Sequence, residues 1–70
     1  MTPQSIGVLV RVDRTRDRVV QDLTAAGMQV ERVMRRLGVV SGTVPREQLA
    51  GLGRIEGVTA VERDREVRTA

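Results

Sequence analysis

The stretch that sets the fold is SIGVLVRVD (residues 5–13), in which apolar residues alternate with small or polar ones. Side chains two apart in a β-strand lie on the same face of a sheet. One face of this stretch therefore holds four branched apolar residues: Ile6, Val8, Val10 and Val12. Leu9 is the apolar exception on the other face. We predict a strand here with one buried face.

A helical pattern follows in residues 15–26. Four apolar residues recur there at helical spacing, namely Val19, Val20, Leu23 and Ala26. Asp13 or Thr15 can cap the start of this helix, because short polar side chains accept hydrogen bonds from the first free N–H groups. Gly27 predicts its end, because glycine is favoured just after the last helical turn.

The next two strands are predicted in residues 29–35 and 39–44. The first has apolar residues that break strict alternation, so we expect a bulge or twist in it; these are Val30, Val33 and Met34. Gly38 marks the turn between the two strands. Gly42 either weakens the second strand or allows another backbone to approach closely.

A second helix and a last strand complete the pattern. Pro45 suits the first turn of a helix, and Leu49, Leu52 and Ile55 give that helix a narrow apolar stripe. Gly57 then opens a final strand over residues 58–63.

The order βαββαβ predicts an α+β fold, a ferredoxin-like sandwich. In this arrangement two helices cover one face of a four-stranded antiparallel sheet, the first and third strands are central, and the second and fourth are edges. The other face stays open. We expect it to carry Leu9, Val61, Thr59 and Arg63.

The length and composition of the chain predict its domain organisation, its stability and its place in the cell. Its 70 residues are predicted to form one domain, residues 1–70, with residues 65–70 as a flexible C-terminal tail. Thirteen valines and no aromatic residue or cysteine leave a small aliphatic core without disulfides, so we expect marginal stability. No apolar run resembles a signal peptide or a transmembrane segment, which predicts a cytoplasmic protein without a membrane partner.

Catalysis is not expected. The chain has no His, Cys or Lys, so it lacks the commonest general base, the thiol nucleophile and the Schiff-base amine. Gly51-Leu52-Gly53 is too short for a nucleotide fingerprint, and we expect no cofactor and no metal. A cluster of carboxylates that could bind a metal is conceivable only at Glu62, Asp64 and Glu66, where interleaved arginines oppose it.

The net charge of +3 comes with nine acids and no aromatic stacking platform, so nucleic acid is not an expected partner.

The chain ends in GVTAVERDREVRTA (residues 57–70), which contains a GV-x-x-V-E-x-D pattern formed by Gly57, Val58, Val61, Glu62 and Asp64. The pattern and the elements before it resemble the propeptides of subtilisin-like serine proteases, the peptidase inhibitor I9 family, and small stand-alone bacterial proteins of that kind. The sequence departs from the propeptide pattern at two points. Val39 and Val40 stand where propeptides usually have an aromatic residue, and the spacing to Pro45 is one residue longer.

The resemblance implies a protein-binding module whose last strand leads into a tail in the protease's active-site cleft. Its protease-binding residues would be Glu62, Asp64, Val67, Arg68, Thr69 and Ala70. In the family, acids at the first two positions cap helix N-termini of the protease. Because the sequence contains no protease domain, the resemblance favours an inhibitor or folding chaperone acting in trans.

Two alternatives remain at this point. The acids near the C-terminus, Glu62, Asp64 and Glu66, could instead pair with Arg63, Arg65 and their neighbours on a solvated strand end. The domain could also be a self-associating or small-ligand-binding ferredoxin-like module, a homo-oligomer through its open sheet face with no protease partner. The tail discriminates between these functions, because only protease binding requires it.

Overall fold

The computed structural model describes residues 5–64, which form one four-stranded sheet and two short helices. The elements in chain order are β1 (Ser5–Val12), α1 (Asp17–Ala25), β2 (Gln29–Met34), β3 (Val39–Pro45), the 3-10 turn η1 (Arg46–Gln48), α2 (Leu49–Leu52) and β4 (Val58–Arg63). The strand order is β2-β3-β1-β4, and every neighbouring pair is antiparallel. The predicted α+β class is therefore correct, and β1 and β3 are central as expected.

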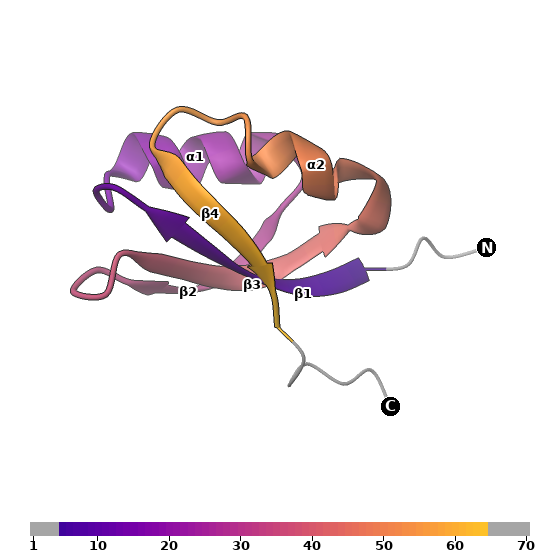
Figure 1. The fold of residues 1–70 in the computed structure, drawn as a ribbon, viewed down its shortest axis with the longest axis horizontal. Coiled ribbons are helices and arrows are strands. Elements are labelled where there is room, and N and C mark those ends of the chain that lie inside the picture. The colour runs from indigo at the N-terminus through magenta and orange to yellow at the C-terminus, as the bar shows by residue number, and fades with distance from the viewer. Residues whose placement is uncertain (1–4, 65–70) are drawn as a thin grey trace.

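Both helices lie on the same side of the sheet and enclose the core with it (Figure 1). The alternation predicted in β1 is confirmed, because Val8 and Val10 are fully buried and Val12 is nearly so. Leu23 of α1 and Leu52 of α2 are fully buried in the same cluster. The core is aliphatic throughout, as the composition requires.

Gly27 ends α1 as predicted. Its φ is +103°, a conformation that favours glycine. The backbone N–H of Gly27 donates to the carbonyl of Thr24 at 3.0 Å, and that of Met28 donates to Leu23 at 3.0 Å. These two bonds are the Schellman motif, in which an apolar contact often accompanies the turn. Leu23 and Met28 are both buried in the core.

The predicted N-terminal cap of α1 is wrong. Arg16 occupies the cap position in an extended conformation, and no side chain caps the helix. The Thr15 hydroxyl instead donates to the carbonyl of Arg35, at 3.4 Å. Thr15 is therefore used to hold the β2–β3 turn against the start of α1.

The second helix is shorter than predicted. The continuous helix expected from Leu49 to Ile55 ends at Leu52, after a 3-10 turn that includes no apolar residue. Pro45 is the last residue of β3 and occupies the N-cap position of η1, so it precedes the helical segment instead of starting it. Glycines at 51 and 53 explain the early end, because glycine is a poor helix former. Ile55 still packs against the core from the following turn.

The irregularity predicted in β2 is present. The register with β3 shifts between Val30 and Arg32, which marks a bulge. Gly42, opposite Val30, is buried, and a Cβ atom there would overlap the carbonyl oxygen of Gln29. Of the two roles proposed for Gly42, close backbone approach is therefore the one found.

Two side chains of β4 lie on the opposite face of the sheet from the one predicted. Val61 lies opposite Val10, and Arg63 lies opposite Val8, so both residues are on the helix-covered face and not on the open one. A register shift between Arg11 and Val12 changes the alternation expected in this strand. Thr59 lies at this irregular point, where its hydroxyl donates to the carbonyl of Arg11 at 3.3 Å.

Candidate functional site

The face of the sheet away from the helices carries the first candidate site. Leu9 of β1 lies opposite Ser41 of β3 on one side and opposite Glu62 of β4 on the other. Residues directly opposite one another in an antiparallel pair share a face. Since Val8 and Val10 point into the core, these three side chains project from the uncovered face. Leu9 is thus where the alternation of β1 predicted it.

Glu62 is oriented by an ion pair within the domain. Its Oε2 atom lies 2.9 Å from Nε of Arg11, which also donates a hydrogen bond to it. The two side chains are about half exposed, at 51% for Glu62 and 57% for Arg11. An exposed pair of this kind adds little to stability. Its consequence is positional, because it holds the Glu62 carboxylate beside Arg11, near the end of β1.

Asp64 is held against the same strand although it follows the end of β4. Its backbone N–H donates to the carbonyl of Gly7 at 2.8 Å, so the pairing of β4 with β1 continues past Arg63. Asp64 is half-buried. This backbone bond fixes the point at which the chain leaves the sheet.

A shallow hollow of about 420 Å³ crosses the uncovered face. Side chains of β1, β2 and β3, together with the residue that follows β4, line it: Leu9, Glu31, Arg32, Met34, Ser41 and Asp64. The lining mixes carboxylates, a guanidinium group and apolar side chains. Such a surface suits a protein partner, because interface centres combine apolar contact with a few polar groups.

The described residues offer little else for chemistry. Between residues 5 and 64, no three His, Cys, Asp or Glu side chains come together as a metal site. No polar or charged side chain in this range is buried. The described helices include none that is long and apolar enough to cross a membrane.

A family model described as "Putative peptidase inhibitor domain" matches residues 1–64 of the chain. The chain belongs to this family. The membership implies a peptidase as the binding partner and a non-catalytic role for the domain. No curated protein and no solved structure matches the chain.

Within this peptidase inhibitor domain, two of the six predicted site residues can be located. Glu62 projects from the uncovered face beside Arg11, and Asp64 lines the hollow on that face. Glu62 pairs with Arg11 and not with the neighbouring Arg63. The other four, Val67, Arg68, Thr69 and Ala70, lie outside the described residues.

Arg11 is the residue of the inhibitor domain that sequence reasoning missed. The alternation in β1 places it on the face of Leu9, which is a signal that the sequence does contain. Its partner could not be found in the same way, because Glu62 lies 51 positions further along the chain. The pairing depends on the register of β1 with β4.

Proposed function

We propose that this domain inhibits a subtilisin-like serine protease, or assists its folding, through the uncovered sheet face and the end of β4. The observation that carries the proposal is the placement of Glu62 and Asp64 beside β1 at the point where the chain leaves the sheet. Membership of a peptidase inhibitor family supports the inhibitory role. The GV-x-x-V-E-x-D pattern at Gly57–Asp64 supports the choice of a subtilisin-like partner.

A ferredoxin-like architecture is part of this proposal. The strand order β2-β3-β1-β4 and the two helices on one side support it. The arrangement leaves the second sheet face free for a partner. Leu9 and Met34 supply apolar surface on that face.

The two carboxylates would meet positively polarised groups of the protease. Free N–H groups at the start of a helix favour a carboxylate, by about 0.3–1 kcal/mol each at an exposed site. Arg11 occupies one oxygen of Glu62, which leaves the other oxygen available to accept a hydrogen bond from the partner.

The residues after Asp64 would then enter the active-site cleft. An extended peptide binds such a cleft by strand addition, with main-chain hydrogen bonds and pockets for alternate side chains. We propose that Val67 and Ala70 fill two of these pockets, while Arg68 and Thr69 point partly to solvent. Anchoring by the folded domain reduces the entropy that a free peptide would lose on binding.

The test is the residual activity of a broad-specificity subtilisin, titrated with four forms of the protein. These are the intact chain, a form ending at residue 66, the variant E62Q/D64N and the control E47Q. Glu47 is an exposed acid on η1, away from the uncovered face. We expect the truncated form to lose inhibition, E62Q/D64N to weaken it, and E47Q to behave like the intact chain. Equal inhibition by the intact and truncated forms, or none by either, would contradict the proposal.

The alternative is self-association through the uncovered face. The hollow lined by Leu9 and Met34 is the observation that favours it. Sedimentation equilibrium of the intact and truncated proteins separates the two functions. A stable dimer that forms equally well without residues 67–70, together with no inhibition, would support the self-associating module.

A further inference from the structure

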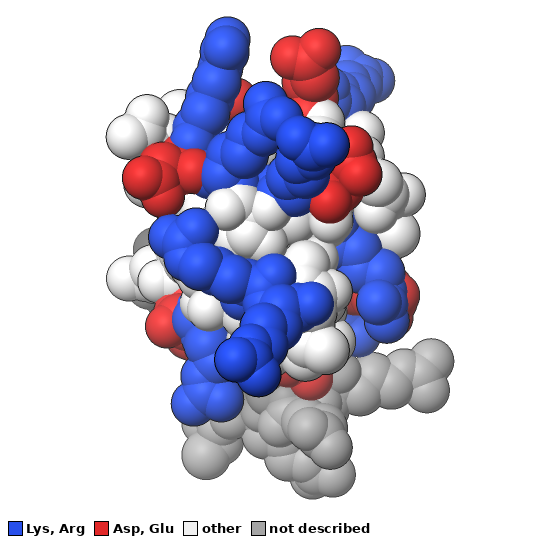
Figure 2. All heavy atoms as spheres, turned by 90° about the vertical axis from the view of Figure 1, so that its left-hand side faces the viewer, with Lys and Arg blue, Asp and Glu red and all other residues white. Residues whose placement is uncertain are grey.

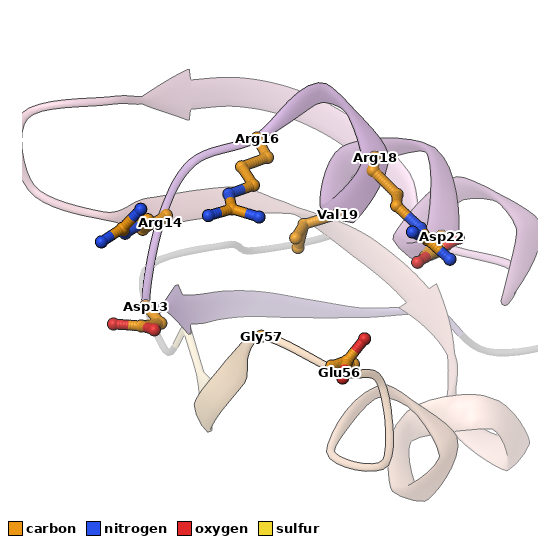
Figure 3. Close-up of a pocket in the computed structure, with 8 residues that line it drawn as sticks. All are labelled: Asp13, Arg14, Arg16, Arg18, Val19, Asp22, Glu56 and Gly57. Carbon is orange, nitrogen blue, oxygen red and sulfur yellow. The ribbon is translucent and has the colours of Figure 1, made fainter.

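A second hollow, of about 310 Å³, lies at the other end of the sheet. It is found where β1 ends and β4 begins, whereas Glu62 and Asp64 lie towards the end of β4. Its lining comes from the β1–α1 loop, the first two turns of α1 and the turn before β4 (Figure 3): Asp13, Arg14, Arg16, Arg18, Val19, Asp22, Glu56 and Gly57. The hollow is separate from the proposed protease-binding face.

Three arginines are the main hydrogen-bond donors of this hollow. Arg14, Arg16 and Arg18 alternate along the chain, and all three are exposed. Within residues 5–64, none of their guanidinium groups forms an ion pair or a side-chain hydrogen bond. The guanidinium group of Arg16 extends over the hollow (Figure 3).

The same side of the molecule is rich in basic side chains (Figure 2). Arg35 in the adjacent β2–β3 turn already binds Asp17, at 3.2 Å between Nη2 and Oδ1. Because Asp17 is paired with Arg35, its carboxylate does not neutralise the neighbouring arginines. Asp13, Asp22 and Glu56 also line the hollow, but among residues 5–64 none of them forms an ion pair with its three arginines.

The floor of the hollow is closed and apolar. Val19 is only 7% exposed, and a Cβ atom on Gly57 would lie 3.1 Å from its Cγ2 atom. A ligand must therefore fit between this floor and the charged side chains around the hollow, which favours a compact ligand.

The charged side chains around the hollow also determine which kind of anion can bind. Guanidinium groups bind oxyanions such as phosphate through paired, charge-assisted hydrogen bonds. Asp13, Asp22 and Glu56 equal the three arginines in number around the hollow, so its lining is not the continuous basic track that an extended polyanion such as nucleic acid needs, and an anion has to be held at the guanidinium groups themselves. We propose that the Arg14–Arg16–Arg18 hollow binds a compact oxyanion of the phosphate class, independently of protease inhibition.

The proposal is tested by titrating the intact protein with inorganic phosphate at constant pH and ionic strength, with chloride as the reference salt. Amide chemical shifts are followed by NMR. We expect saturable changes confined to residues 13–18 and 56–57. R16Q should raise the dissociation constant about tenfold, as expected for the loss of one charge-assisted bond pair. The matched control is R46Q, since Arg46 is exposed on η1, outside the hollow.

Circular dichroism of R16Q checks that the fold is intact, and R14Q provides a second, independent variant. Changes that do not saturate, or an equal dissociation constant for R16Q and R46Q, would mean an adventitious ion only and would overturn the proposal. A phosphomonoester such as phosphoserine should compete for the same residues. Binding to phosphatidylglycerol vesicles in the absence of phosphate binding would indicate a membrane surface instead, and would also overturn it.

Discussion

Arg11 and Glu62 form an ion pair between β1 and β4, although Leu9 and not Arg11 lies directly opposite Glu62. The contact is therefore diagonal across the two strands, which long side chains can span. It connects a central strand to an edge strand on the face that the helices leave uncovered.

R11M should lower the free energy of unfolding by about 0.2–1 kcal/mol, because the pair is exposed and screened by water. The effect should shrink in ~1 M NaCl, where charges at the surface are screened. Urea unfolding of R11M, E62Q and the double variant gives the coupling energy of the pair. R63M is the control, since Arg63 lies on the other face of the sheet. A coupling energy unchanged by salt would contradict the prediction.

L23A should be strongly destabilising. Leu23 is fully buried, and removing a buried leucine side chain leaves a cavity that lowers stability by about 2–5 kcal/mol. A small aliphatic core has little stability in excess of that amount, so we expect the variant to be largely unfolded at room temperature. Circular dichroism and thermal melting measure this directly.

The matched control for L23A is L37A, because Leu37 is 70% exposed. Its unfolding free energy should stay within about 0.5 kcal/mol of the parent value. If L23A melted cooperatively at nearly the parent temperature, the core described for α1 would be incorrect.

G42A and G51A should have opposite effects on stability. A Cβ atom at Gly42 would overlap the Gln29 carbonyl, so β2 and β3 would have to separate, at about 1–3 kcal/mol. A Cβ atom at Gly51 in α2 meets nothing within 4 Å. Alanine there should be neutral or stabilise by up to about 1 kcal/mol, because it reduces the freedom of the unfolded chain.

Urea unfolding of both glycine variants provides the measurement, and hydrogen exchange locates the damage. In G42A, amides of β2 should exchange faster than those of the β1–β4 pair. Equal stability of G42A and G51A would show that β2 and β3 are further apart than described.

R35M should loosen the contact between the β2–β3 turn and the start of α1. Arg35 donates to the carbonyl of Thr15 at 2.9 Å and to Asp17, while its own carbonyl accepts from the Thr15 hydroxyl. These bonds are exposed, so we expect a loss of about 0.5–1.5 kcal/mol. R36M is the control, because Arg36 has no side-chain bond among residues 5–64.

Native-state hydrogen exchange by NMR distinguishes the two variants. R35M should accelerate exchange at the start of α1, whereas R36M should leave it unchanged. Identical protection in both variants would indicate that Arg35 does not hold this turn.

Much of the fold was predictable from local patterns. The alternation at residues 5–13 predicted β1 and its buried face, and the position of Gly27 predicted the end of α1. Both signals are short-range, because side-chain periodicity and the backbone freedom of glycine act within a few residues. The irregular apolar spacing at Val30 and Val33 likewise predicted the bulge in β2.

Other features depended on contacts between distant segments. Thr15 bonds to Arg35 instead of capping α1, because the β2–β3 turn brings a competing acceptor to it. The helix expected up to Ile55 ends at Leu52 while Ile55 keeps its place on the core. At Thr15, tertiary packing outweighed the local capping preference, whereas the early end of α2 follows from the glycines at 51 and 53.

The sequence by itself determined the α+β class, the order of the elements and the aliphatic core, and it singled out Glu62 and Asp64 as candidate binding residues. Only the tertiary structure decided which face each side chain of β4 occupies. The register shift at Arg11 and Val12 put Val61 on the core side and left Glu62 beside Arg11. The physical reason is that a shift of one residue exchanges the two faces of a strand, and such a shift arises from pairing between segments far apart in the chain.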